Sequence, residues 1–526
     1  MNPESAEHLR RSRQQDAETI LSTHPGVLDA VVVVLEDEGT GDARLVAYAV
    51  PDDDYIGRVF AAGEAERKRV QTWRKTFDLS QFGKQANLSN PGFNTAGWNS
   101  SYTRQPIPAE PMREWVELTV QELRTFHPQE ILEIGCGTGL LLLRLARECK
   151  RYAGTDFSSA VLKKLRKQME ELGEDWSNVT LLERSAENFE GFAENSFDTF
   201  ILNSVAQHFP SLSYLLEVIQ GAIRVVKSGG LIFIGDVRSL VLLEPYAGSI
   251  ELYQAPSSMS LGELRERVFH RMRSEEQLVI SPEFFLALRD RFPKISRVEV
   301  HPKLGYFDNE MTRFRYNAIL HLDKPQDGNL ELSFLDCCEH RLALDSIAAL
   351  LRNSNSDFLA IKNVINARIE NDVEVVAQLA RTEASKTVGE LRERLERRSL
   401  LGIDPQKICA LGQELGYRVD LSWATSRPDG NYDVVFRKIV DSARPVHQAI
   451  TWPQADLDTS QLARYANVPG LAVLREKLIR QLLDYLRQNL SPDKAPTELI
   501  LMDALPMTPD GQVNIHKLPV PDTPTG

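Results

Sequence analysis

The sequence predicts an α/β protein whose central sheet is mostly parallel and covered by helices on both faces. Between residues 131 and 240, short apolar runs alternate with amphipathic helical stretches, which is the pattern of successive strand–helix–strand units. The first of these runs, ILEI at 131–134, leads directly into Gly135, Gly137 and Gly139. Glycines at the end of a strand are typical of a turn that lets a ligand approach the backbone closely.

The expected elements of this region follow one another in a regular order. By sequence they are ILEIG, LLLRLARECK, RYAGTD, SAVLKKLRKQMEEL, VTLLE, FDTFILN, YLLEVIQGAIRVV and LIFIGDV. Residues 260–400 are mostly helical and charged, with further strands expected near 296–301 and 314–323. We therefore expect helical additions around the parallel sheet.

Composition and charge exclude several classes of function. The 526 residues carry a formal net charge of −13, which argues against a general binder of nucleic acid or another polyanion. No apolar run reaches the roughly 18 residues that span a bilayer, and residues 1–15 lack the apolar core of a signal peptide. Five scattered cysteines fit neither a disulfide framework nor a zinc site, and the histidines are too dispersed for a metal. We therefore expect a cytoplasmic protein that binds no membrane, no nucleic acid and no metal.

The spacing of the glycine turn discriminates between two kinds of nucleotide-like ligand. A dinucleotide site is expected to read GxGxxG, whereas this chain reads Glu133-x-Gly135-x-Gly137-x-Gly139. The second strand, RYAGTD, ends in Asp156, where a carboxylate can accept hydrogen bonds from two ribose hydroxyls. A tight turn with a solvated aspartate is the alternative, but it requires five positions to coincide. The combination of glycines and acids resembles class I S-adenosylmethionine (SAM)-dependent methyltransferases.

That resemblance implies cofactor contacts along the carboxyl edge of the sheet. In the family the first acid lies near the methionine amino end of SAM, and the glycines flank the cofactor. SAENF (185–189) follows the third strand, where adenine contacts are expected, and NSVAQHF (203–209) follows the fourth, on the substrate side. The residues assigned to cofactor binding are Glu133, Gly135, Gly137, Gly139, Asp156, Phe157, Ala186, Glu187 and Asn203.

Longer motifs are similar to the methyltransferase domains embedded in nonribosomal peptide synthetases. They are GWNSSYTRQPIPAEPMREWVE, ILEIGCGTGLLLLRLA, YAGTDFS, ILNSVAQHFPS, GGLIFIGDVRSLVLLEPY and NEMTRFRYNAIL, and the resemblance covers roughly residues 70–440. It implies SAM as the methyl donor and S-adenosylhomocysteine as the product. It also implies an acyl substrate on the phosphopantetheine arm of a carrier protein, with other synthetase domains as neighbours.

The two ends of the chain resemble the halves of the small C-terminal subdomain of an adenylation domain. ILSTHPGVLDAVVVVLEDEGTGDARLVAYAV looks like the first half, and MDALPMTPDGQVNIHKLPVPD looks like the last motif. Asp510, Gly511 and Gln512 replace the family's Asn-Gly-Lys, and a neutral amide cannot supply the charge of the lysine. The resemblance therefore implies a degenerate subdomain that displays the methyltransferase and has no adenylation activity.

These features divide the chain into four segments. They are the first half of the subdomain (1–52), lead-in helices with a substrate lid (53–130), the methyltransferase core with a helical insertion (131–440) and the second half of the subdomain (441–526). The expected fold is therefore Rossmann-like, of the class I methyltransferase type. Helical additions and a small α+β subdomain formed from both chain ends complete it.

The loop after the fourth strand suggests which atom receives the methyl group. N-methylating relatives usually read Gln-Tyr-Phe there, whereas this chain reads Gln207-His208-Phe209. An α-amine, with a pKa of about 7.7–8.0, needs orientation more than a base. A hydroxyl, with a pKa nearer ~15.7, benefits from a base such as histidine. A polar residue at a helix start is the alternative role for His208. We favour O-methylation narrowly, with N-methylation of an aminoacyl thioester close behind.

Further residues are assigned to the catalytic and substrate sites. Asp236 or Glu310 could orient the imidazole of His208, although a strand-end cap and a surface salt bridge are the alternatives. Arg104 replaces a glycine common in the SSYTG motif, and Asn317 stands where relatives often carry aspartate. The expected substrate contacts are Tyr102, Arg104, Gln207, Arg238 and Asn317.

A catalytically silent scaffold, which would hold neighbouring synthetase domains apart, is the main rival to an active enzyme. The intact Glu133, Asp156 and glycines argue against it, because a silent domain has no physical need for them.

Overall fold

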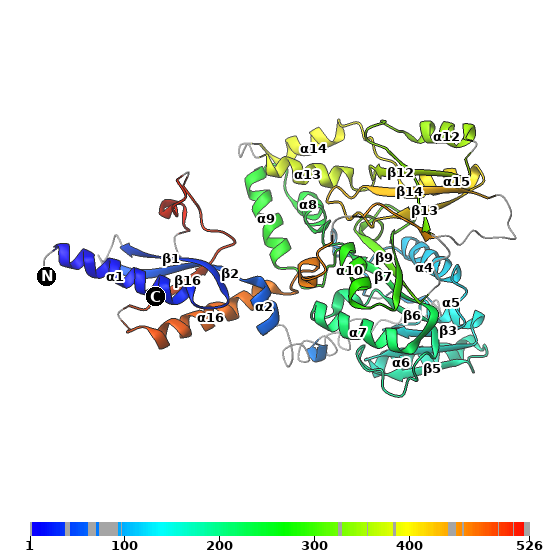
Figure 1. The fold of residues 1–526 in the computed structure, drawn as a ribbon, viewed down its shortest axis with the longest axis horizontal. Coiled ribbons are helices and arrows are strands. Elements are labelled where there is room, and N and C mark those ends of the chain that lie inside the picture. Colours follow the sequence, from blue (N-terminus) through cyan, green and yellow to red (C-terminus); the bar gives the residue numbers. More distant parts are fainter. Residues whose placement is uncertain are drawn as a thin grey trace. The chain divides into compact units, whose positions relative to one another are not determined.

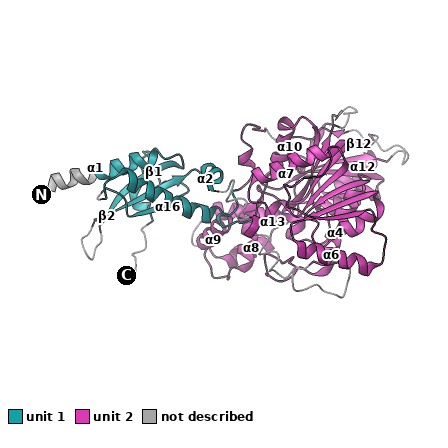
Figure 2. Cartoon of the chain, turned by 90° about the horizontal axis from the view of Figure 1, so that it is seen from below, with its two compact units in different colours: residues 1–67, 273–276, 468–526 teal, residues 68–272, 277–467 magenta. Residues whose placement is uncertain are grey.

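The structure is a computed structural model. The residues that it describes are 3–36, 43–60, 70–72, 93–95, 97–323, 329–354, 356–381, 386–439, 449–454, 457–492, 494–508 and 510–519. The chain divides into two units, which Figure 2 draws in teal (1–67, 273–276 and 468–526) and magenta (68–272 and 277–467). The expected boundary at 440/441 and residues 61–69 and 73–92 of the lead-in segment lie outside the described residues.

A seven-stranded sheet forms the centre of the magenta unit, in the order β5-β4-β3-β6-β7-β9-β8 (Figure 1). The first five strands in this order run parallel. Strand β9 is antiparallel to both β7 and β8, so β8 runs in the same direction as the first five. Their bounds are β3 (Glu130–Ile134), β4 (Arg151–Asp156), β5 (Val179–Glu183), β6 (Phe197–Asn203), β7 (Val226–Arg238), β8 (Ile295–Pro302) and β9 (Arg315–Leu322). The sheet confirms the fold class predicted from the alternation of strands and helices.

Helices bury both faces of this sheet. Leu132, Phe200 and Ile232 belong to one hydrophobic cluster, whereas their neighbours Ile131 and Phe233 belong to another. Because both faces are covered, the strands read as nearly continuous apolar runs. The helices that cover the two faces are α7 (Leu212–Val225) and α10 (Pro282–Arg291) on the first, and α4 (Ala109–Arg124), α5 (Leu142–Leu145) and α6 (Ser159–Leu172) on the second.

Capping residues explain where helix α6 begins and ends. The Ser158 hydroxyl accepts a hydrogen bond from the backbone N–H of Val161 at 3.2 Å, and Gly173 adopts the left-handed conformation (φ +65°) at the other end. Leu162 and Leu165 lie on the buried side of the helix. The helix therefore begins directly after strand β4, at the carboxyl edge of the sheet.

A second sheet lies C-terminal to the first in the sequence, with the order β11-β12-β14-β13. The sequence indicated a mostly helical region here, and it missed β12 because Lys362 and Asn363 interrupt the apolar run. The strands are β11 (Phe334–Asp336), β12 (Phe358–Val364), β13 (Tyr417–Ser422) and β14 (Tyr432–Lys438). Helices α12 (Leu344–Asn353) and α15 (Pro405–Glu414) share a hydrophobic cluster with this sheet. Helices α8 (Leu243–Gln254), α9 (Leu261–Arg273), α13 (Glu370–Ala380) and α14 (Val388–Glu396) share a separate one.

Both ends of the chain build the teal unit. Strand β16 (Glu498–Leu501) pairs in parallel with β2 (Ala43–Pro51), which pairs with β1 (Val27–Glu36). Helix α16 (Leu471–Asn489) buries leucines at a spacing of four residues (Leu474, Leu478, Leu482 and Leu486) against this sheet and helix α1 (Pro3–Ser22). Strand pairing and a shared core therefore join segments that are more than 400 residues apart.

Short elements complete the described structure. They are α2 (Asp53–Phe60), β10 (Asn329–Leu330), β15 (Ala449–Ile450), α11 (Glu310–Arg313), η1 (Ala146–Glu148), η2 (Ala206–His208), η3 (Leu462–Tyr465) and η4 (Ile515–Lys517). Across the described residues, no helix combines the length and the apolar character that crossing a bilayer requires.

Candidate active site

The glycine turn after β3 has two packed glycines and one open one. Gly135 and Gly137 have φ values of +72° and +52°, a region that favours glycine. A Cβ at Gly135 would come within 2.4 Å of Val205, and one at Gly139 within 2.5 Å of Leu165. A Cβ at Gly137 would meet nothing closer than a backbone oxygen at 3.9 Å. The middle glycine thus leaves space for a ligand.

That space is part of a cavity of about 630 Å³ along the carboxyl edge of the sheet. Its wall includes Asp156 at the end of β4, Glu133 on β3 and Asn203 at the end of β6. It continues to His208 and to Arg315, the first residue of β9. Because the sheet order is β4-β3-β6-β7-β9, these side chains follow one another across the sheet.

Two carboxylates lie beside the glycine turn. Asp156 accepts hydrogen bonds from the backbone N–H groups of Gly137 (3.0 Å) and Ser158 (2.9 Å). Glu133 accepts one from the Tyr152 hydroxyl at 2.8 Å. Burial, with a smaller contribution from the charge of Asp156, raises the pKa of Glu133 to about 7. A cationic ligand would stabilise the ionised form of this carboxyl.

Two buried amide oxygens, on residues that line the cavity, have no hydrogen-bond partner among the described residues. They are the side-chain oxygens of Asn203 and Gln207. A buried acceptor without a partner is costly, so a donor that reaches either oxygen would be stabilising.

Of the residues expected near the adenine of SAM, two line the cavity and one does not. Phe157 and Ala186 line the cavity. Glu187 is exposed, accepts a hydrogen bond from Ser185 at 2.7 Å and contacts the Tyr214 hydroxyl. Tyr214 itself lines the cavity, whereas Glu187 does not.

His208 lies at the end of the short helix η2 and lines the cavity. Burial, together with the nearby guanidinium groups of Arg315 and Arg238 and against the opposing charge of Asp236, lowers the pKa of its imidazole to about 4. The imidazole is therefore neutral at physiological pH. It can accept a hydrogen bond, but it is a weak base.

Asp236, one of the two expected partners of His208, is the centre of a buried network. Its carboxylate accepts hydrogen bonds from Arg315 (2.6 Å), Ser204 (2.7 Å) and the Trp115 indole (3.2 Å). Its backbone N–H donates to Asn317 at 2.9 Å, and its φ of +61° is unusual for aspartate. Its side chain therefore holds Arg315 in place.

Glu310, the other expected partner, holds the loop before helix α4. Its two carboxylate oxygens accept hydrogen bonds from the backbone N–H and the hydroxyl of Ser101, each at 2.8 Å. Tyr246 also donates to the Ser101 hydroxyl, at 2.7 Å. All three residues line the cavity, so this cluster closes one side of it.

Of the expected substrate contacts, Gln207 lines the cavity, and the other four lie behind or outside its described wall. The Tyr102 hydroxyl is 2.8 Å from Ser249, on helix α8. Arg104 is exposed, and its φ of +59° explains why a glycine suits this position. Arg238 donates to Gln277 at 2.8 Å, and Asn317 lies in the network beneath Asp236.

Several cavity residues were not expected from the sequence. They are Trp98, Ser101, Trp115, Ser204, Gln277 and Arg315. All of them except Gln277 lie inside the motifs GWNSSYTRQPIPAEPMREWVE, ILNSVAQHFPS and NEMTRFRYNAIL, so the motifs carried a signal for them. Gln277 comes from a segment outside these motifs.

Comparison with known proteins agrees with this geometry. Residues 132–234 match a family model described as a methyltransferase domain. The chain carries a SAM-dependent methyltransferase domain, and along nearly its whole length it is similar to segments of nonribosomal peptide synthetases. Three relatives match it along nearly its whole length: the chondramide synthase of Chondromyces crocatus (38% identity, 97% of this chain, 13% of the relative), a probable non-canonical nonribosomal peptide synthetase, CymA, of Salinispora arenicola (30%, 99%, 6%) and a beauvericin nonribosomal cyclodepsipeptide synthetase of Beauveria bassiana (25%, 97%, 16%). The chain thus spans less than a fifth of each relative.

The residues of the methyltransferase site fit the cofactor of this class, SAM. The carboxylate of Glu133 suits its cationic amino group, and that of Asp156 suits ribose hydroxyls. The open space at Gly137 and the unpartnered oxygen of Asn203 add room and an acceptor.

The raised pKa of Glu133 predicts a pH-dependent affinity for SAM. As pH rises through about 7, the carboxyl of the empty site ionises and gains attraction for the ammonium group. We expect the Kd for SAM to fall roughly tenfold between about pH 5.5 and about pH 7, measured by titration calorimetry. Glu133→Gln, which cannot ionise, should bind weakly at both values. A wild-type Kd that is the same at both would contradict the assignment.

Proposed function

We propose that this methyltransferase domain transfers a methyl group from SAM to an acyl group that a carrier protein presents on its phosphopantetheine arm. The observation that most supports this proposal is the composition of the cavity wall. Carboxylates lie beside the glycine turn, whereas an imidazole, an amide and a guanidinium lie farther along the sheet. The similarity to synthetases supports the carrier-bound substrate and neighbouring synthetase domains as partners.

The two parts of the cavity would have different tasks. Glu133 and Asp156 would hold the cofactor, which supplies an electrophilic methyl group for in-line transfer. His208 and Gln207 would orient the nucleophile, since a neutral imidazole and an amide oxygen both accept hydrogen bonds. The Ser101 loop, held by Glu310, would limit the access of water on that side.

N-methylation of an α-amine is the acceptor chemistry that the charges favour. The guanidinium groups that lower the pKa of His208 would also disfavour a protonated amine at the same place. An amine that enters with a pKa of about 7.7–8.0 would thus be kept neutral and nucleophilic. The proton of the methylated ammonium product can leave to solvent without a strong base.

O-methylation with His208 as general base is the second candidate. The observation in its favour is the histidine itself, which lines the cavity in its unprotonated form. It would take the hydroxyl proton as the methyl group is transferred. Its lowered pKa makes this step harder, because the imidazolium would form in a buried site and beside two guanidinium groups.

We further propose that the teal unit is a degenerate adenylation-type subdomain. Its sheet is built from both chain ends, as a subdomain split by an inserted methyltransferase would be. Gln512 is exposed in a turn where its backbone oxygen accepts a hydrogen bond from the Thr508 N–H at 2.7 Å. The unit would display the methyltransferase without adenylating, because this turn offers no lysine.

A direct assay tests the function and the acceptor atom together. The protein is incubated with SAM and a carrier protein loaded with matched 2-aminoacyl or 2-hydroxyacyl thioesters, and the products are weighed by mass spectrometry. We expect the aminoacyl form to gain one methyl group on nitrogen and the hydroxyacyl form to react much more slowly. Methylation of the hydroxyl alone would establish O-methylation instead, and the absence of any transfer would favour a silent scaffold.

Removal of the His208 imidazole should slow the reaction without weakening cofactor binding. For His208→Ala we expect a loss of roughly 10- to 100-fold in kcat, as for a hydrogen bond that orients the nucleophile, with the Kd for SAM retained. Because the pKa of His208 is about 4, we expect the pH–rate profiles of wild type and His208→Gln to have the same shape near pH 6.5. An inflection there that His208→Gln removes would show that the histidine titrates as an ordinary base.

A further inference from the structure

Arg315 is a buried cation on the wall of the cavity, and nothing in the sequence motifs assigns it a role. Its side chain is only 13% exposed. In the described part of the chain, its one side-chain hydrogen bond goes from Nη1 to Asp236, at 2.6 Å. A guanidinium has five N–H donors in a planar fork, so most of its donors are available on the cavity side.

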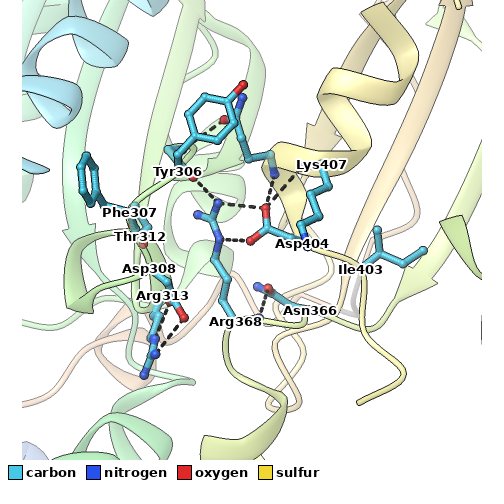
Figure 3. A network of polar contacts seen from close by, with 12 residues as sticks. Tyr306, Phe307, Asp308, Thr312, Arg313, Asn366, Arg368, Ile403, Asp404 and Lys407 are labelled. Atoms are coloured by element: carbon cyan, nitrogen blue, oxygen red, sulfur yellow. Dashed lines mark hydrogen bonds and ion pairs between the residues drawn. The ribbon is translucent and has the colours of Figure 1, made fainter. Parts of the chain in front are cut away.

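Another buried arginine shows what a purely structural role looks like in this protein. Arg368 donates to both carboxylate oxygens of Asp404, at 2.8 and 3.0 Å (Figure 3). It also donates to the backbone oxygens of Lys303 and Gly305. Its fork is filled by protein acceptors, and it does not line the described cavity. Arg315 differs on both counts.

Asp236 orients the Arg315 guanidinium but accepts a hydrogen bond from only one of its nitrogens. The carboxylate divides its bonds among Arg315, Ser204 and Trp115, and it is itself fully buried. Arg238 lies close enough to act on His208 and adds a second positive charge to this region. Of the nearby carboxylates, Glu310 is engaged by Ser101. This region therefore carries cationic donors that suit an oxygen acceptor.

We propose that Arg315 binds the carbonyl oxygen of the acyl thioester and that Asp236 is its positioning residue. The inference rests on the proposed function and adds a substrate-binding residue to it. Gln207, whose side-chain oxygen has no partner among the described residues, would accept the hydrogen of the nucleophile. Arg315 as the donor and Gln207 as the acceptor would together recognise an acyl group that carries a nucleophile with a hydrogen beside its carbonyl.

Two substrates that differ only in the carbonyl test the proposal. One is the carrier-bound acyl thioester, and the other is its thioether analogue, in which a methylene group replaces the carbonyl. We expect wild type to favour the thioester in kcat/KM by roughly 10- to 100-fold, and Arg315→Gln to reduce this preference to about twofold. Each preference compares the same two substrates, so the intrinsic difference between their amines cancels between the two proteins.

A matched control comes from the second sheet. Arg437 pairs with Asp420 at 2.7 Å, and its side chain is also 13% exposed, but it lies outside the cavity wall. Arg437→Gln should keep the wild-type preference. The Kd for SAM, measured for every variant, confirms that the cofactor site is formed. Arg315→Lys keeps the charge but loses the fork, and we expect an intermediate preference.

The outcomes distinguish a failure of the role proposed for Arg315 from a failure of the proposed methyltransferase function. If Arg315→Gln methylates both substrates with the wild-type preference, Arg315 does not bind the carbonyl, although the methyltransferase function stands. If wild type methylates neither substrate while it binds SAM, the proposed function fails and the role of Arg315 fails with it.

Discussion

The site depends on the ion pair and hydrogen bonds that the buried carboxylate of Asp236 makes. Asp236 connects strand β7, on which it lies, to β9 through Arg315, to helix α4 through Trp115, and to the loop after β6 through Ser204. Removing one partner of a buried ion pair costs about 3–5 kcal/mol, because the remaining charge is left without compensation. The backbone at Asp236 also adopts a left-handed conformation (φ +61°), which the surrounding contacts must maintain. One residue thus fixes the wall of the cavity that faces the acyl substrate in our proposal.

The cavity follows from the topology of the sheet. In open α/β sheets, ligands bind beyond the carboxyl ends of the strands. Here the order of the strands places Asp156 and Glu133 on one side and Arg315 on the other, with Asn203 between them. Carboxylates suit the cationic and hydroxyl groups of SAM, and a guanidinium suits the oxygen of an acyl group. The edge of one sheet can therefore hold a donor and an acceptor of the methyl group side by side.

Much of this arrangement could be predicted from the sequence because it is local. The glycine turn and the acid that ends β4 depend on a strand and the residues next to it, and the fold class depends on a periodic pattern. The rest could not be predicted, because it depends on contacts between distant segments. Asp236 was expected to orient His208, but the spacing of residues carries no information about its bond to Arg315, 79 residues away. The environment of His208 was equally hidden, since its pKa is lowered by burial in the fold and by guanidinium groups from two other strands. The second sheet was missed because polar residues interrupt the apolar run of β12.

Binding of S-adenosylhomocysteine measures the central claim, that the carboxyl edge of this sheet is a SAM site, without requiring a substrate. Titration calorimetry on wild type should give one site per chain. Asp156→Asn should weaken binding by about tenfold or more, because it loses the charge that attracts ribose hydroxyls but can still accept the bond from Gly137. The exposed Asp345 on helix α12 provides the control, and Asp345→Asn should bind as wild type does. No binding by wild type, or equal binding by Asp156→Asn and wild type, would contradict the account.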